Sequence, residues 1–171
     1  MSLYYYIHGS GLLEIKEVAL ETFFNYKQRS FFHTESGGIL FGYEYEGRIC
    51  IDSVTVPSPK DKRGVFHFFR DKRRAQELVD HEFIRSQGKH IYIGEWHTHC
   101  QSRPAPSSKD IYEWRNAFDK SLLNLDFMVC IVVGNTMSLG NLWVGCVDGF
   151  GVRQIDSLSH CEGISQGRVD D

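Results

Sequence analysis

GEWHTHCQSRPAPSSKD, residues 94–110, lies where a strand-like hydrophobic run, residues 90–96, leads into a segment of helical periodicity, residues 107–121. Side chains at positions i and i+2 of a strand share a face, so His97 and His99 point to one side if the strand continues through them. Two imidazoles on one face supply half of a tetrahedral zinc site. The proline-containing loop gives the chain room to turn back, which makes Asp110 the best local candidate for a third ligand.

A purely structural interpretation of the same residues stays open. Ser107 and Asp110 fit the [ST]-x-x-[DE] capping box, in which both side chains would only satisfy N–H groups at the start of a helix. A pair of histidines also occurs without metal on surfaces and in cores. Cys100 would point to the opposite side of a continuing strand, so we interpret it as a structural residue rather than a ligand.

A zinc hydrolase also needs a proton acceptor, because the water that zinc activates, with its pKa lowered to about 7, must lose its proton. The segment TESGGILFG offers Glu35 just before a glycine pair and an apolar strand. Gly37 and Gly38 permit close backbone approach, which predicts that a substrate lies along this strand edge. Taken alone, Glu35 is an ordinary loop carboxylate.

Outward from these segments, hydrophobic patterning predicts the order β-α-β-β-β-α-β-α-β-β. This order is typical of an α/β fold, in α+β layers, with a mixed sheet and helices packed on it. The predicted helices cover residues 14–30, 71–88 and 107–121. The predicted strands lie in residues 3–7, 37–59 (two strands with a turn at 46–47), 64–70, 90–96, 127–134 and 140–152.

Length and composition predict one globular domain, residues 1–155, followed by a polar C-terminal tail, residues 156–171. The formal charge of −3 gives no general attraction to nucleic acid or anionic membranes, and we interpret the basic run at residues 60–74 as a solvated surface. Five widely spaced cysteines indicate reduced thiols. Without a secretory signal or an apolar run near about 18 residues, the sequence predicts a cytoplasmic protein with no nucleic-acid or membrane partner.

Glu35, His97-Thr98-His99 and Ser107-Ser108-Lys109-Asp110 together resemble the JAMM motif of the JAB/MPN metalloproteases, an upstream glutamate followed by H-x-H-x(7)-S-x(2)-D. Every position of that motif is filled, and the resemblance extends from about residue 30 to about residue 147. It implies the cytidine-deaminase-like fold of that family, a curved mixed sheet packed between helices.

The resemblance also implies roles. His97, His99 and Asp110 would hold one Zn²⁺, with water as the fourth ligand. Glu35 would act as general base and then return the proton to the leaving amine. Ser107 would donate a hydrogen bond to the developing oxyanion. The implied reaction is hydrolysis of a peptide or isopeptide bond after the C-terminal tail of ubiquitin or a ubiquitin-like modifier, laid as an added strand beside the site.

Within the family, IYIGEWHTH, residues 91–99, and the compact size are most similar to bacterial stand-alone JAB proteins of CBASS-type anti-phage operons. Those peptidases remove a target from the C-terminus of a conjugated cyclic-nucleotide synthase. The implied partner is therefore a protein with an extended C-terminal tail, either a ubiquitin-like modifier or a synthase conjugated by E1- and E2-like enzymes. Cys100 departs from the pattern, because many relatives have proline there.

Other classes fit the same residues less well. Zinc deaminases require H-x-E and P-C-x-x-C, and PAPSSKD has no such cysteine pair. Metallo-β-lactamase-like hydrolases would extend the pair to H-x-H-x-D-H, whereas this chain reads HTHCQS. A catalytically silent MPN-like scaffold that binds metal and regulates protein interactions is the alternative function. Such scaffolds typically lose ligands, and this chain retains every motif position.

Overall fold

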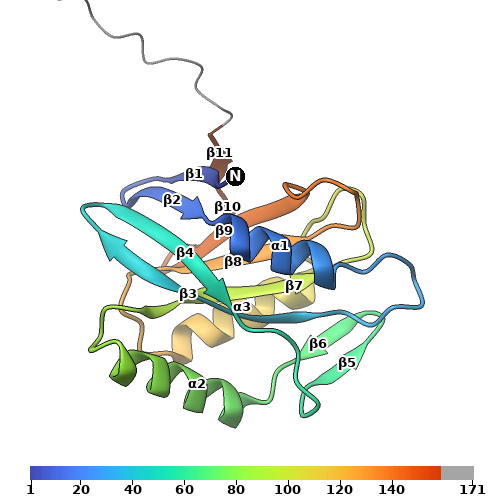
Figure 1. The fold of residues 1–171 in the computed structure, drawn as a ribbon, viewed down its shortest axis with the longest axis horizontal. Helices are drawn as coiled ribbons and strands as arrows, with labels where there is room; N and C mark the ends of the chain where they lie inside the picture. The colour runs from blue at the N-terminus through green and yellow to red at the C-terminus, as the bar shows by residue number, and fades with distance from the viewer. Residues whose placement is uncertain (159–171) are drawn as a thin grey trace, which may run out of the picture.

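The computed structural model describes residues 1–158 and is built around a long mixed sheet (Figure 1). Within these residues nine strands form one sheet in the order β10-β9-β8-β7-β3-β4-β2-β1-β11. Two neighbouring pairs, β2 with β4 and β7 with β8, are parallel and the others are antiparallel. The strands are β1 Leu3–Ile7, β2 Gly11–Ile15, β3 Gly37–Tyr45, β4 Arg48–Val54, β7 Ile91–Thr98, β8 Met128–Val133, β9 Leu142–Asp148, β10 Gly151–Gln154 and β11 Asp156–Ser157.

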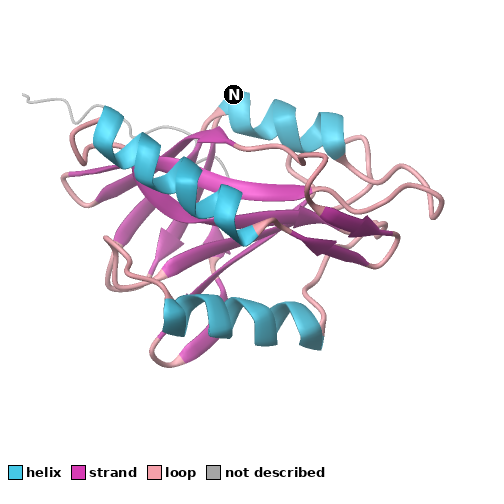
Figure 2. Ribbon diagram, turned by 90° about the horizontal axis from the view of Figure 1, so that it is seen from below, coloured by secondary structure: helices cyan, strands magenta, loops and turns pink. Residues whose placement is uncertain are grey.

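Helices lie on both sides of the sheet, as the view in Figure 2 shows. They are α1 Glu17–Tyr26, α2 Lys72–Arg85 and α3 Ser108–Lys120. A separate two-stranded hairpin, β5 Lys62–Gly64 and β6 His67–Phe69, stands beside the main sheet. The predicted fold class, a curved mixed sheet between helices, is confirmed.

Strand β8 is buried on both faces of the sheet. Its side chains alternate between two cores because successive residues of a strand point to opposite faces. One core contains α1 through Ala19, Leu20 and Phe23, and the other contains α3 through Trp114. A strand covered on both faces is apolar throughout. The first core receives Val129, Ile131 and Val133, and the second receives Met128, Cys130 and Val132.

Three predicted elements differ from the structure. Residues 14–15, predicted as the start of a helix, belong to β2, and α1 begins only at Glu17. Leu13 and Ile15 are fully buried there because β2 pairs with both β1 and the distant β4. The single strand predicted at 64–70 is the hairpin β5–β6, and the segment 140–152 contains two strands, β9 and β10.

The C-terminal part of the described chain joins the sheet. Strand β11 pairs with β1, with Ser157 opposite Tyr5 and Asp156 opposite Tyr6. The predicted polar tail therefore begins in the sheet, and its residues 159–171 lie outside the described residues. Among residues 1–158, no helix has both the length and the apolar character required to cross a membrane.

Candidate metal centre

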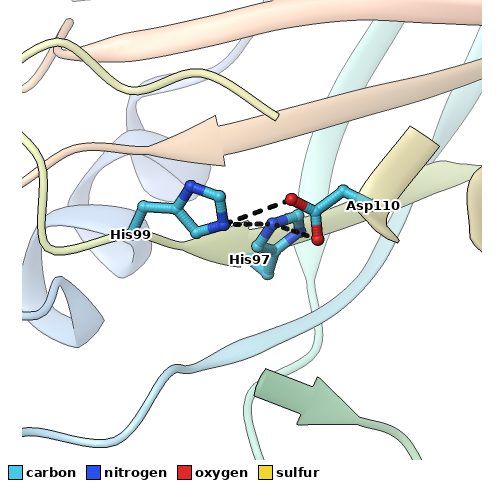
Figure 3. Close-up of side chains that lie close together, drawn as sticks. All are labelled: His97, His99 and Asp110. Atoms are coloured by element: carbon cyan, nitrogen blue, oxygen red, sulfur yellow. Dashed lines mark hydrogen bonds and ion pairs between the residues drawn. The ribbon is translucent and has the colours of Figure 1, made fainter. Parts of the chain in front are cut away.

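Three predicted ligands meet at the end of β7. His97 is the penultimate residue of β7, and His99 continues the strand's course because its N–H donates to the carbonyl of Val133 at 2.9 Å. Asp110 comes from the first turn of α3. The two histidine Nε2 atoms are 3.1 Å apart, and each lies 3.3 Å from one carboxylate oxygen of Asp110 (Figure 3).

These distances fit one tetrahedral metal ion. With metal–ligand bonds near 2.0–2.1 Å, tetrahedral geometry separates neighbouring ligand atoms by about 3.3 Å. The observed separations of 3.1 and 3.3 Å agree with that value. The side chains are 10%, 12% and 18% exposed for His97, His99 and Asp110, so solvent reaches the cluster only in part. Two imidazoles and one carboxylate are a donor set suited to Zn²⁺ with one position left for water.

The pairing of β7 with the residue before β3 sets the direction of the two histidines. Thr98, fully buried between them, donates its N–H to the carbonyl of Ser36 at 2.8 Å and accepts the Ser36 N–H on its hydroxyl at 2.9 Å. Gly37 is opposite His97 in the same antiparallel register. His97 and His99 consequently face the side of the sheet that α3 covers.

Trp114 supports His97, a contact that the sequence reading missed. Its ring centroid is 5.5 Å from that of His97, and its other neighbour is Trp143, stacked at 5.8 Å. The sequence spacing could have predicted this contact, because Asp110 and Trp114 are four residues apart and therefore share a face of α3. Helix α3 therefore carries both one candidate ligand, Asp110, and the ring that packs against another, His97.

Comparison with known families adds independent evidence to this geometry. A model of the prokaryotic homologs of the JAB domain matches residues 18–144. The chain belongs to this family. The matched range includes every candidate site residue of this JAB domain, from Glu35 to Asp110.

Curated relatives of this JAB domain carry the name CD-NTase/cGAS isopeptidase. The protein from Pseudomonas aeruginosa is 32% identical over 146 residues, which cover 85% of this chain and 89% of the relative. The one from Vibrio cholerae is 31% identical over 121 residues, 71% of this chain and 72% of the relative. A solution structure of a Desulfitobacterium hafniense protein has a TM-score of 0.56 and 16% identity, covering 82% of this chain and 87% of that one, and supports the fold.

Glu35 lies in the same cavity as the three candidate ligands of the JAB domain. The cavity has a volume of about 770 Å³ and is lined by Glu35, the ligand residues and Ser107. Because Ser36 faces Thr98 in an antiparallel arrangement, Glu35 falls beside His99. Burial raises the pKa of Glu35 to about 7, although nearby His99 opposes the shift. A carboxylate whose pKa is near neutrality is well suited to accept and return a proton.

Ser107 and Asp110 form the capping box that their spacing predicts. The Ser107 hydroxyl accepts the Asp110 N–H at 3.1 Å, and the Ser107 N–H donates to Asp110 Oδ2 at 2.6 Å. The hydroxyl also donates to Asp110 Oδ2 at 2.6 Å. Burial alone would raise the pKa of Asp110, but hydrogen bonds from His97, His99 and Ser107 lower it well below its usual range. The structural and metal-site interpretations of Asp110 are therefore compatible, since one carboxylate makes both sets of contacts.

The glycine pair at the start of β3 allows two other segments of the chain to pack closely against it. A Cβ at Gly38 would lie 2.2 Å from the carbonyl oxygen of Thr55, and one at Gly37 would lie 2.6 Å from the Phe68 ring. Close approach is confirmed at both positions. These contacts occupy the space beside the glycine pair, and the expectation that a substrate lies along this strand edge stays a prediction.

The rest of the cavity wall contains residues that the sequence analysis did not assign to the site, among them Arg70 and Cys100. Arg70, part of the basic run, pairs with Glu95 of β7, and Tyr92 donates its hydroxyl hydrogen to the same carboxylate at 3.1 Å. Cys100 also lines the cavity, with its Sγ 3.6 Å from the Asn135 amide nitrogen. The cavity runs from hairpin β5–β6 between residues of α2 and α3.

Replacing Ser107 by alanine separates its two predicted roles. Loss of the cap is expected to lower the free energy of unfolding by about 1 kcal/mol, measured by urea titration. If the hydroxyl also turns toward a substrate oxyanion, kcat of the zinc-loaded protein falls about 100- to 1,000-fold. Ser108→Ala is the matched control, since Ser108 is the exposed neighbour at the first helical position. Reduced stability with unchanged kcat would leave Ser107 only the capping role.

Proposed function

We propose that this JAB domain is a zinc-dependent isopeptidase that hydrolyses the bond after the C-terminus of a conjugated protein. One observation carries the proposal: His97, His99 and Asp110 present converging ligand atoms in a cavity that also contains the buried carboxyl group of Glu35. The names of the relatives from Pseudomonas aeruginosa and Vibrio cholerae support the same reaction class.

Each residue has a distinct part in the proposed reaction. The imidazole Nε2 atoms of His97 and His99 and the carboxylate of Asp110 would hold the ion. Zn²⁺ supplies Lewis acidity that allows a water molecule to ionise near neutral pH. Glu35 would accept the proton of the attacking water and transfer it to the amine nitrogen as the C–N bond breaks. Ser107 would reorient its hydroxyl from Asp110 to donate to the carbonyl oxygen in the transition state.

We infer that the substrate is a cyclic-nucleotide synthase conjugated through its C-terminus, as part of bacterial anti-phage defence in the cytoplasm. The names of the relatives support a synthase of this kind as the partner. The cavity extends well beyond the metal ligands, from hairpin β5–β6 to residues 121–124 after α3. A cavity lined by residues from the hairpin as far as the segment after α3 gives room for an extended polypeptide tail.

The proposal is tested with a synthase fusion, in which the C-terminus of a bacterial cyclic-nucleotide synthase is joined to a reporter protein. Isopeptide conjugates made with E1- and E2-like enzymes form a second arm. We expect zinc-loaded protein to release the synthase with an intact C-terminus, read by intact mass, and chelator-treated protein to release none until Zn²⁺ is restored. Stoichiometric zinc binding without cleavage of any conjugate would instead favour the silent metal-binding scaffold.

A further inference from the structure

Hairpin β5–β6 holds the main chain of Glu35 on both sides. Glu35 belongs to the segment of residues 27–36 between α1 and β3, which has no regular secondary structure. Its N–H donates to the carbonyl of Gly64 at 2.8 Å, and its carbonyl accepts from Arg63 Nε at 2.7 Å. The main-chain position of the candidate general base thus depends on two adjacent residues of β5, nearly 30 positions further along the chain.

Arg63 makes a second contact that links Glu35 to the metal ligands. Its Nη2 donates to Ser36 Oγ at 2.7 Å, so the planar guanidinium bridges two successive residues of the segment. Ser36 is in turn bonded to Thr98, which lies between His97 and His99. The guanidinium therefore bonds the Glu35 main chain and the Ser36 side chain, while the Ser36 main chain bonds the strand that carries the candidate ligands.

The position of the hairpin in turn depends on its contacts with residues near the site. Strands of three residues do not form a stable hairpin alone. Phe68 packs on Gly37, and buried Gln28 donates its amide hydrogens to the carbonyls of Val65 at 3.1 Å and His33 at 2.8 Å. The hairpin and the segment that carries Glu35 consequently hold each other in position.

We propose that Arg63 is a positioning residue that keeps Glu35 aligned with the metal centre, an inference that rests on the proposed function for its effect on turnover. Arg63 is not among the residues that line the cavity, so it acts through Glu35 and Ser36 rather than on the substrate. The basic run at residues 60–74, interpreted from sequence as a solvated surface, thus contains one cation whose head group organises the site.

The test compares Arg63→Ala and Arg63→Lys with the wild-type chain, each loaded with zinc. Arg63 is an exposed residue, so these variants are expected to fold. Displacement of Glu35 should lower kcat on the synthase fusion about 10- to 100-fold, with KM nearly unchanged and full zinc content. Lysine can supply one donor of the two, so Arg63→Lys should recover part of the loss. Lys62→Ala removes an exposed cation from the same strand and is the matched control.

A second readout needs no substrate. Amide hydrogen exchange, followed by NMR in the zinc-loaded protein, should be faster at Glu35 and Ser36 by about tenfold or more in Arg63→Ala and unchanged in Lys62→Ala. Unchanged exchange and kcat in Arg63→Ala, or an equal loss in Lys62→Ala, would overturn the positioning role. If the wild-type chain cleaves no conjugate, the proposed function fails, while amide exchange still decides whether Arg63 holds this segment.

Discussion

Zinc binding is expected to be lost when either histidine ligand is removed. His97→Ala and His99→Ala each leave two ligands. Removing a residue that only hydrogen-bonds to a metal ligand lowers metal affinity by up to about 100-fold. Removing a ligand itself is therefore expected to lower zinc affinity by more than about 100-fold. Cleavage of the synthase fusion should fall by more than about 1,000-fold, since the metal contributes several kcal/mol to the reaction. Asp110→Asn tests the third candidate ligand with a side chain whose amide oxygen can still accept the Ser107 N–H of the capping box.

The measurements are zinc content by mass spectrometry and competition titration with a coloured chelator. His81→Ala is the matched control, because His81 is an exposed histidine on α2. His99→Ala isolates the ligand role better than His97→Ala, since the His97 ring also packs near Trp114. Unchanged zinc affinity in His99→Ala would remove His99 from the ligand set.

Replacing Glu35 by glutamine is expected to stop turnover while leaving zinc bound. Glutamine keeps the size of the side chain but cannot accept the proton, and general base catalysis typically contributes about 100- to 10,000-fold. We therefore expect kcat on the synthase fusion to fall within that range, with zinc content and melting temperature close to wild type. Because Glu35 is buried, removing its carboxyl group also relieves the cost of burying a charge.

Glu44→Gln is the control for this variant, because Glu44 lies on the same strand, β3, and is exposed. Both variants remove one carboxylate, so a general charge effect would appear in each. Wild-type kcat in Glu35→Gln would contradict its assignment as general base, whatever the metal content. Loss of zinc in Glu35→Gln would show instead that the residue supports the metal centre itself.

Much of the fold could be predicted because its signals are local. Asp71 caps α2 by accepting the N–H of Arg74 at 2.8 Å, and Ser107 caps α3, as their positions before helical segments predict. The turn between β3 and β4 has positive φ at Glu46 and Gly47, 50° and 74°, in agreement with the predicted glutamate and glycine turn. Each of these features depends on residues within one or two turns of chain.

The sequence predictions that were wrong share a different cause. Strand β2 was not predicted, and its residues 14–15 were assigned to a helix, because its strand partners include β4, more than 30 residues away. Arg63 and Arg70 read as a solvated basic surface because their partners, Glu35 and Glu95, are remote in sequence. Local hydrophobic patterning contains no information on such pairings.

For the candidate site, the sequence by itself determined which residues are the candidate ligands and the relative direction of their side chains. The i, i+2 spacing of His97 and His99 on a strand and the place of Asp110 in the first turn of a helix required no knowledge of the fold. Only the tertiary structure decided that Glu35 lies beside His99 and that two residues of β5 form hydrogen bonds with its main chain. Antiparallel pairing places Ser36 opposite Thr98, which brings Glu35 next to His99. Arg63 and Gly64 form hydrogen bonds with Glu35 although nearly 30 residues separate them in sequence, and no local sequence pattern predicts contacts over such a distance.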